Sequence, residues 1–363
     1  MRTSPWQLAR LFIVYFNSQA AIFLVPTLLN DKDYQGWMGI IAGYLGSLAL
    51  LWFTVYVVRA NGNKPWIQFG RKLLGRWIHG FFVLLVLAWC VYYTAFDMQT
   101  FVLFFSSNYL RDTPPWFILT IIGLVILYTV TRGFPTLVYM AEGLFLLIIG
   151  TMAYMAFLFT QQADYQMMRA MVTSFDGMKL MKHGVITLSW FAEWILLLFV
   201  APDLKLEKGT FKRIAIAETG LCLVVLYSWL LILMIFGPYL GAEFDYPYVI
   251  RSMNTESIMS KTAPLLIGVW SASMFIHSAF LIYCAIRSVL HFTRGKGERL
   301  MAPVLIGIAW LIAYYYANHL AIYRMHFYST VTVILWIVVE LIPVYYTFAF
   351  WFPLRRRKTS AAA

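Results

Sequence analysis

The chain has 363 residues, of which 61% are hydrophobic and 12% charged, and its mean hydropathy is +0.72. No soluble domain of this length could bury so much apolar surface, so the composition excludes a soluble protein and indicates a polytopic membrane protein. The net charge of +12 invites a nucleic-acid interpretation, which the placement of the basic residues removes below. Cys90, Cys222 and Cys284 all lie inside apolar runs, which argues against a disulfide framework and against a metal site.

Long apolar runs predict an all-α protein with ten transmembrane helices in a single transmembrane domain, residues 1–363. The first run continues as a full span, so it does not resemble a cleavable signal. The predicted spans are Leu8–Leu29, Gly36–Val58, Ile78–Phe105, Pro115–Val130, Pro135–Phe159, Val185–Ala201, Ile214–Phe236, Pro264–Leu290, Pro303–Leu320 and Ser329–Phe352.

The connecting segments alternate in basic content. With the N-terminus in the cytoplasm, 20 of the 28 Lys and Arg residues fall inside and 8 outside. This bias predicts that both termini are cytoplasmic, with 353–363 as a basic tail. The excess positive charge is therefore mostly a feature of membrane topology, and no nucleic-acid partner is expected.

The connector between the second and third spans, Lys64–Arg76, alternates apolar and basic residues at helical spacing. One interpretation is a short helix on the cytoplasmic leaflet with anionic lipid headgroups as its partner. The other is an ordinary amphipathic connector packed on the helix bundle.

Ten spans with both ends inside divide into two sets of five with opposite orientation, which predicts an inverted repeat. The first repeat covers about 7–160 and the second about 185–352. The first span has a polar interruption at Asn17, Ser18 and Gln19, followed by Ala20, and the sixth has Glu193 in mid-span. These features predict that helices one and six are broken and expose backbone groups at mid-membrane.

Other costly polar residues occur in corresponding spans of the two halves. Asp97 in span three and His277 in span eight are candidates for ligand contact or proton transfer, although a satisfied core role is an equal alternative for His277. Glu142 in span five and Glu340 in span ten are further ion or proton candidates, with structural pairing favoured. Glu218 in span seven is expected to form a local ion pair with Lys212 or Arg213.

Several stretches resemble those of a known family. They are FGRKLLGRWIHG (Phe69–Gly80), Leu110-Arg-Asp-Thr-Pro114, Ala141-Glu142, PTLLNDKDYQGWMGII (Pro26–Ile41), Glu193 with Pro202, and Trp270. Together they resemble the spore germination permeases, the B subunits of Ger-type nutrient germinant receptors, within the amino acid–polyamine–organocation superfamily.

The resemblance implies a LeuT-like fold and a ligand-sensing subunit in the spore inner membrane, acting with an A subunit and a C-subunit lipoprotein. Its ligand would be a small nutrient such as an amino acid, nucleoside or sugar. Mapped by position, the pocket would contain residues of spans one, three, six and eight: Ser18, Gln19, Ala20, Tyr93, Asp97, Phe191, Ala192, Glu193 and His277.

The sequence also bears on two other functions. A proton- or sodium-coupled amino acid transporter would use the same fold and the same pocket, with Asp97, Glu193, Glu142 and Glu340 as coupling candidates. An intramembrane enzyme is disfavoured, because the sequence lacks His-Glu-x-x-His, Gly-x-Ser-x-Gly and a phosphate-binding loop. No cofactor is expected.

Overall fold

The structure is a computed structural model that describes residues 3–18, 24–29, 31, 33–62, 64–160, 163–173, 175–205, 207–241, 258–293, 295, 297–327 and 329–351. Nearly all of these residues are helical, as predicted. Eight helical segments are long and apolar enough to cross a membrane, and Pro115–Thr131 is a shorter apolar helix. Gln19 and Ala20, most of the loop 237–263 and the tail 353–363 lie outside the described residues.

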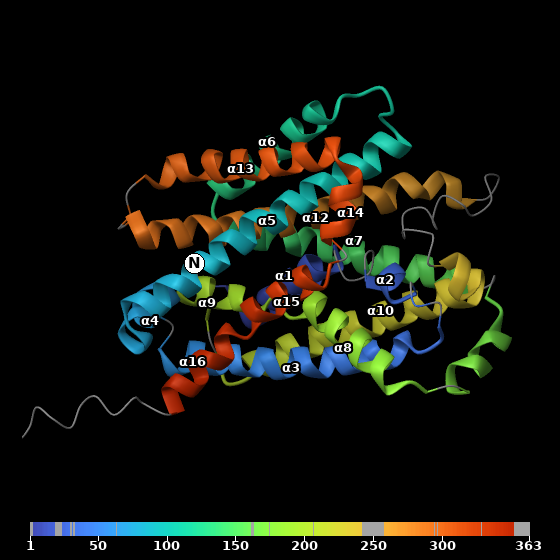
Figure 1. Ribbon diagram of the computed structural model, residues 1–363, viewed down its shortest axis with the longest axis horizontal. Helices are drawn as coiled ribbons and strands as arrows, with labels where there is room; N and C mark the ends of the chain where they lie inside the picture. The colour runs from blue at the N-terminus through green and yellow to red at the C-terminus, as the bar shows by residue number, and fades with distance from the viewer. Residues whose placement is uncertain are drawn as a thin grey trace, which may run out of the picture.

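Most helices run along one direction, so the molecule is an elongated bundle (Figure 1). The helices of the first half are α1 (Pro5–Asn17), α2 (Val25–Leu29), α3 (Gly36–Ala60), α4 (Trp66–Leu74), α5 (Arg76–Asn108), α6 (Pro115–Thr131) and α7 (Phe134–Thr160). Those of the second half are α8 (Gly177–Phe191), α9 (Leu197–Val200), α10 (Thr210–Gly241), α12 (Ile258–Thr293), α13 (Glu298–Asn318), α14 (Leu320–Phe327), α15 (Thr330–Glu340) and α16 (Ile342–Trp351), with short 3-10 turns at η2 (Tyr165–Val172), η3 (Trp194–Leu196) and η4 (Ala201–Asp203).

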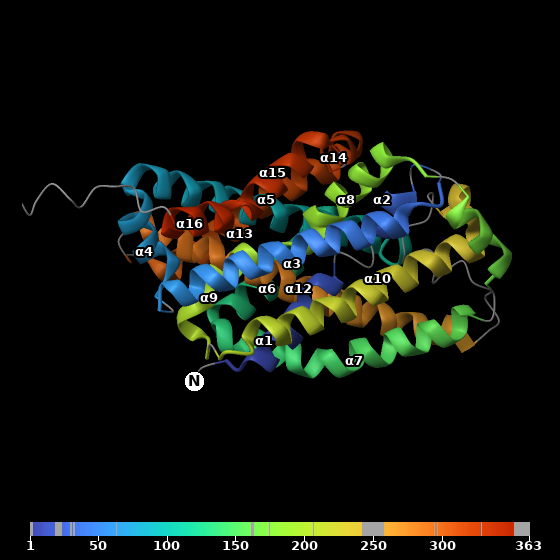
Figure 2. The ribbon, with the colours of Figure 1, turned by 90° about the horizontal axis from the view of Figure 1, so that it is seen from below.

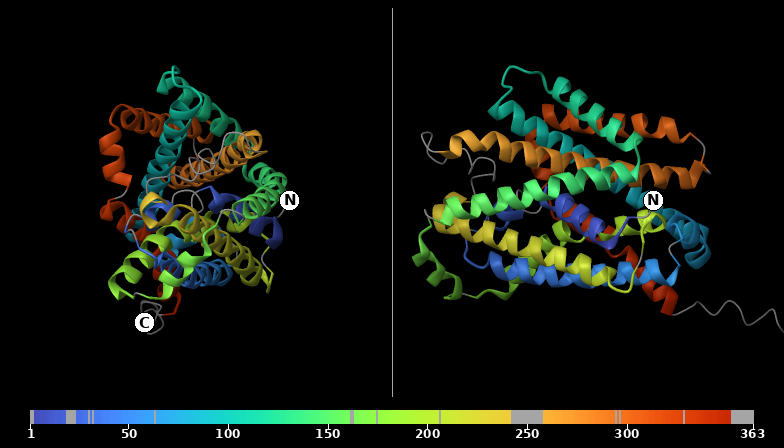
Figure 3. Two further views of the ribbon diagram at one scale, coloured as in Figure 1. Left: turned by 90° about the vertical axis from the view of Figure 1, so that its right-hand side faces the viewer. Right: turned by 180° about the vertical axis from the view of Figure 1, so that it is seen from behind.

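The helices form two groups that meet at the centre of the bundle. In one group α5, α6, α12 and α13 pack on one another, and in the other α3 packs on α8 and α10, and α10 packs on α1. Figures 1 and 2 show these groups from two directions, and Figure 3 shows them from one end and from behind. Because α1 also contacts α12, and α15 contacts both α5 and α8, the central polar residues lie where the groups meet.

Close packing of α3 on α8 depends on glycines spaced along one face of α3. A Cβ at Gly39 would lie 2.2 Å from the Cβ of His183, and a Cβ at Gly43 would lie 2.5 Å from that of Thr187. Small residues allow two helix backbones to approach closely, which is a common way to pack helices in membranes. The contact fixes α8 along α3 and so places the end of α8 beside Ser47.

The helix of the sixth predicted span begins earlier than its hydropathy indicates. We expected a start at Val185, but α8 begins at Gly177, because the carboxylate of Asp176 accepts hydrogen bonds from the backbone N–H groups of Met178 and Lys179. Capping of this kind stabilises a helix start that hydropathy cannot detect. The first turns of α8 consequently include Lys179, Lys182 and His183.

The amphipathic connector forms α4, which packs on α5 and α16. Trp66 is fully buried, and a Cβ at Gly70 would lie 2.4 Å from the ring of His79. The His79 ring holds the connector in place, since its Nδ1 is 2.6 Å from the hydroxyl of Tyr346 and its Nε2 is 3.1 Å from the carbonyl of Ile67. The opposite face of α4, with Lys72, is exposed.

Candidate functional site

Regular helix stops in the middle of the sixth predicted span. The helix α8 ends at Phe191, and Ala192 (φ −114°, ψ 25°) and Glu193 (φ −66°, ψ 35°) depart from helical geometry before η3. Ser47 of α3 braces this point: its hydroxyl donates to the carbonyl of Phe191 at 2.9 Å and accepts from the indole N–H of Trp194 at 2.9 Å. The backbone carbonyl that loses its helical partner therefore finds a side-chain donor.

Glu193 is fully buried, and its carboxyl contacts Tyr15 of α1. Its Oε2 accepts a short hydrogen bond from the hydroxyl of Tyr15. The other carboxylate oxygen, Oε1, is buried with no hydrogen-bond partner among the described residues. A buried carboxyl with unused acceptor capacity is costly and marks a candidate site.

His277 of α12 links Glu193 to Asp97 of α5. Its Nδ1 is 2.7 Å from Asp97 Oδ2, which also accepts a 2.7 Å hydrogen bond from the hydroxyl of Ser278. Its Nε2 is 3.5 Å from Glu193 Oε2, too long for a strong hydrogen bond, and the ring stacks on that of Tyr15 with 4.3 Å between centroids. We call Tyr15, Asp97, Glu193, His277 and Ser278 the central cluster.

The central cluster can hold a proton in more than one place. Asp97 accepts two hydrogen bonds, which suits a carboxylate that receives the Nδ1 proton of His277. The Nε2 of His277 then either carries a proton and pairs with ionised Glu193, or is bare and faces protonated Glu193. A ligand or ion that binds near Glu193 would change where the proton resides.

Tyr93 lies between the central cluster and a pocket. Its ring centroid is 4.8 Å from that of His277 and 5.0 Å from that of Trp336. The pocket has a volume of about 70 Å³ and lies between α5, α8 and α15. Besides Tyr93, the residues that line it are Thr27, Ile186, Ser189, Trp190, Thr332, Val333 and Trp336. That volume is several times the roughly 10–15 Å³ that one water molecule needs.

The first span reaches the same region from the other side. The helix α1 ends at Asn17, and the hydroxyl of Ser18 donates to the carbonyl of Tyr15 at 2.7 Å. The indole N–H of Trp270 on α12 donates to the carbonyl of Ser18 at 3.4 Å. Of the residues predicted for this wall of the pocket, the structure therefore places Ser18 beside the cluster.

The remaining intramembrane acids have separate surroundings. Glu142 on α7 accepts from Arg10 at 3.0 Å and from Gln7 at 3.2 Å, both on α1, which fits the structural pairing that we favoured. Glu340, at the end of α15, is buried, and its carboxyl is close enough to Glu193 for the two groups to interact electrostatically. The ion pair expected for Glu218 is wrong: this carboxyl is buried next to Ser47, and Arg213 pairs with Glu207 instead.

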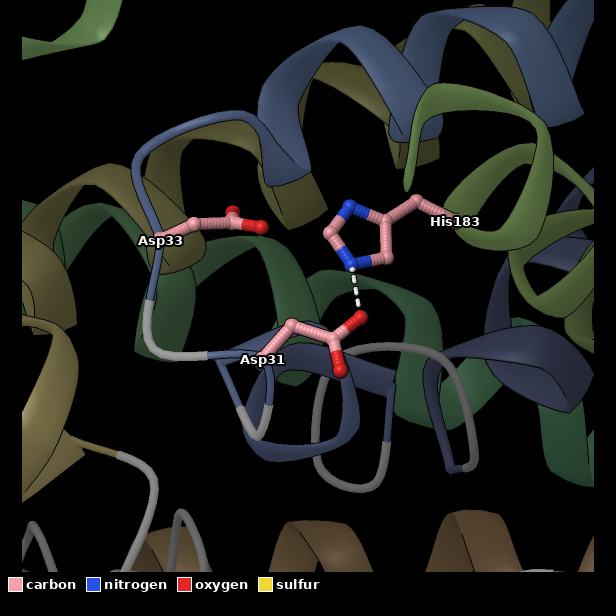
Figure 4. A group of neighbouring side chains, drawn as sticks. All are labelled: Asp31, Asp33 and His183. Atoms are coloured by element: carbon pink, nitrogen blue, oxygen red, sulfur yellow. Dashed lines mark hydrogen bonds and ion pairs between the residues drawn. The ribbon is translucent and has the colours of Figure 1, made fainter. Parts of the chain in front are cut away.

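A second histidine with two acids lies between the segment after α2 and the start of α8. Figure 4 shows His183 directed toward Asp31 and Asp33, with His183 Nε2 2.9 Å from Asp31 Oδ2. One atom of each residue lies within 4.8 Å of the others, the spacing of a metal site. Both carboxylates are already neutralised, because Lys182 Nζ is 2.6 Å from Asp31 and Lys179 Nζ is 3.3 Å from Asp33.

We call these five residues the loop cluster. Burial opposes ionisation of Asp31, but the hydrogen bonds from Lys182 and His183 outweigh it and hold the pKa of Asp31 below its usual range. The charges of two acids and two lysines balance, so the group is best described as a set of ion pairs that ties the chain after α2 to α8.

Sequence reasoning missed Tyr15, Ser47 and Ser278. Each is an ordinary residue within an apolar run, so nothing in its local pattern distinguishes it from a packing residue. Ser278 carries the best available signal, since it directly follows a histidine in mid-span. The partners of the central carboxyl groups become visible only when the helices are packed.

The fold resembles that of solved transporters. The chain superposes on Mhp1, a nucleobase-cation-symport-1 family transporter, in a closed conformation with bromovinylhydantoin bound, with a TM-score of 0.68 and 16% identity over 99% of this chain and 80% of that one. The inward-facing conformation of Mhp1 gives a TM-score of 0.60 over 99% of this chain and 79% of that one, again at 16% identity. This is a LeuT-type fold.

Sequence comparison is more specific. The chain is 21% identical to spore germination protein KB of Bacillus subtilis (strain 168) over 326 residues, 85% of this chain and 84% of the relative. It is also 21% identical to spore germination protein XB of Bacillus anthracis over 294 residues, 78% of this chain and 80% of the relative. Residues 3–322 match the spore permease family model, described as spore germination protein. The chain is therefore an integral membrane protein that belongs to the spore germination permease family.

Proposed function

We propose that this protein is the nutrient-sensing B subunit of a germinant receptor. It binds a small nutrient, such as an amino acid, nucleoside or sugar, beside the central cluster and couples binding to ion release and germination. Its partners are the receptor's A subunit and C-subunit lipoprotein. It resides in the spore inner membrane with both termini in the cytoplasm.

The observation that carries this proposal is the position of Glu193. Its carboxyl stands at the irregular turn after α8, is fully buried, and has one oxygen without a hydrogen-bond partner among the described residues. An acid in that state is suited to a polar ligand group, which would supply the missing hydrogen bond. The pocket lined by Tyr93 and Trp336 lies beside the central cluster, since the ring of Tyr93 also contacts that of His277.

The central cluster also offers a way to report binding. Tyr15 and Glu193 belong to one group of helices, whereas Asp97 and His277 belong to the other. A ligand that bonds Glu193 Oε1 draws on the same carboxyl that Tyr15 and His277 contact through Oε2, and so changes the contacts that join the two groups. The conformational equilibrium then shifts by the difference in the ligand's affinity for the two states. In this proposal, α1 and α8 are the broken helices of an inverted repeat.

The test begins with a thermal-shift screen of the purified chain against amino acids, nucleosides and sugars, since a ligand that binds the folded state raises its stability. We expect Glu193→Gln to abolish the shift caused by the active compound while the protein remains folded. Glu142→Gln is the matched control, because it changes the same functional group in an ion pair with Arg10. An undiminished shift in Glu193→Gln would place the ligand elsewhere.

A coupled amino acid transporter is the second candidate. The Asp97–His277–Glu193 series favours it, because it provides the exchangeable proton that a symporter would need. Counterflow of the active compound into proteoliposomes that contain only this chain separates the two functions. Saturable uptake lost in Glu193→Gln would establish transport, whereas stabilisation without flux would support a sensor.

A further inference from the structure

A second hollow in the structure lies far from the central cluster, at the end of the bundle where α4 packs. It has a volume of about 240 Å³. It is bordered by the turn after α3, by α4 and by Phe350 near the end of α16. Figure 1 shows α4 and α16 together at this end of the molecule. None of the residues that line it belongs to the pocket beside Tyr93 or to the ion pairs described above.

The hollow is basic. Lys64 and Lys72 line it and are both exposed, and none of the described residues that line it is acidic. Neither lysine forms an ion pair with any carboxylate among the described residues, in contrast to Lys179 and Lys182 of the loop cluster. Two cations that face one hollow without a counter-charge attract an anion, and ammonium groups are suited to phosphate.

The other lining groups divide the hollow into a polar and an apolar part. The side chains of Asn61 and Gln68 supply amide groups, and the Asn61 amide donates to the carbonyl of Lys64 at 3.0 Å, which holds the turn. Phe69 and Phe350, whose ring centroids are 6.1 Å apart, supply an apolar wall. A ligand with an anionic head and an apolar portion matches this division.

The surroundings indicate a lipid as the source of the anion. Next to α4, the first turns of α5 expose Trp77 (86%) and Phe81 (62%), as expected for side chains that face the membrane interface and the acyl chains. The buried Trp66 and Phe69 hold α4 against the bundle, and an amphipathic helix held in this way beside the exposed Trp77 is expected to present its lysines to the headgroups. We propose that this hollow binds the phosphate headgroup of an anionic glycerophospholipid.

The test compares two double variants of the full-length chain, purified and delipidated in a neutral detergent. Lys64→Gln with Lys72→Gln removes both cations of the hollow. Lys208→Gln with Lys212→Gln is the control, because it removes two exposed lysines from α10 and the loop before it, which lies at the same end of the bundle since Arg59 bonds the carbonyl of Lys208. Binding of phosphatidylglycerol is measured by native mass spectrometry and by the lipid-dependent rise in melting temperature.

We expect the first variant to bind phosphatidylglycerol about 25-fold more weakly, since each lysine near a membrane surface contributes roughly fivefold. The control should change by less than about threefold, and phosphatidylcholine should bind neither protein appreciably. Lys64→Arg with Lys72→Arg should restore most of the affinity.

Three outcomes would overturn the proposal. Equal weakening in both double variants would mean that the effect is general surface charge, and unchanged binding in the first variant would place the lipid elsewhere. Equal stabilisation by soluble glycerol phosphate would show a site for a free anion. If the first variant does not fold, photo-crosslinking of a phosphatidylglycerol probe to wild-type protein decides the question: absence of the label from the peptide 61–73 would reject the site.

Discussion

The central cluster and the loop cluster contain the same chemical set, a histidine with two acids, in opposite circumstances. His277 with Asp97 and Glu193 is fully enclosed and bonded to hydroxyl groups, whereas His183 with Asp31 and Asp33 is shared with two partly exposed lysines. In the loop cluster the lysines fix the charges. Among the described residues, no lysine or arginine forms an ion pair with the central cluster, whose acids are paired with His277 instead. The two clusters therefore differ in burial and in counter-ions and not in residue type. These two properties distinguish a candidate binding site from a set of ion pairs that only stabilises the fold.

The largest effect should come from removing the central histidine. We expect His277→Leu to destabilise the protein by about 3–5 kcal/mol, because it leaves two buried acids without their shared partner. The free energy of unfolding can be measured by SDS titration in mixed micelles.

The matched control is His183→Leu in the loop cluster. We expect a loss of at most about 1–2 kcal/mol there, because Asp31 and Asp33 keep their lysines and only one hydrogen bond is lost. Equal losses in the two variants would mean that the two clusters are not energetically different, and would remove the contrast drawn above.

A smaller but substantial effect is expected where α3 meets α8, since that contact positions both clusters. Gly43→Ala places a Cβ 2.5 Å from the Cβ of Thr187 and should cost about 1–3 kcal/mol through overpacking. Gly220→Ala on α10 has no atom within 4 Å of its new Cβ and should be neutral or stabilising by up to about 1 kcal/mol. Thermal unfolding monitored by intrinsic fluorescence checks both, and a neutral Gly43→Ala would show that the helices can separate without cost.

The hydrogen bonds of Ser47 at the end of α8 are expected to contribute a similar amount. Ser47→Ala removes the donor to the Phe191 carbonyl and the acceptor of the Trp194 indole, and should cost about 1–3 kcal/mol. It should also weaken the ligand-induced thermal shift, because Glu193 follows the loosened turn. Ser288→Ala is the control, since that buried hydroxyl bonds only within its own helix, to the Cys284 carbonyl. A ligand-induced shift that is equal in the two variants would separate the turn from binding.

A residue of the candidate site could be predicted from the sequence only where its side chain carries a free-energy cost in the membrane whatever its neighbours are. Glu193, Asp97 and His277 are visible in the sequence because an ionisable group in an apolar run is expensive wherever its partner lies. The structure brings these three together from different spans. Tyr15 and Ser47 were not predictable, because a hydroxyl in an apolar helix has no such cost and its role arises from packing.

The two wrong predictions, for the partner of Glu218 and for the start of α8, also arose because local sequence does not show how a helix packs or is capped. Glu218 has two basic residues within six positions, which suggested an ion pair, but helix α10 turns its carboxyl into the bundle while Arg213 reaches Glu207. The start of α8 was placed at the first strongly apolar residue, whereas the Asp176 cap starts the helix two turns earlier. Sequence patterns identified the helices well, but not which side of a helix a single polar residue occupies.

The smallest effect should come from the loop cluster's lysine. Lys182→Gln should change stability by about 1 kcal/mol or less near neutral pH, because exposed ion pairs contribute little.

The same variant should be distinguished from wild type by the pH dependence of its stability. The pKa of Asp31 is lower in the folded protein than in the unfolded chain, so Asp31 contributes stability above the unfolded value of about 3.9, and this is lost as the pH falls through the folded value. Removing Lys182 raises the folded pKa toward the unfolded one. The variant should therefore lose less of its melting temperature than wild type between pH 5 and 3, with Lys212→Gln behaving like wild type. An unchanged acid profile in Lys182→Gln would mean that His183, not the lysine, sets the charge of Asp31.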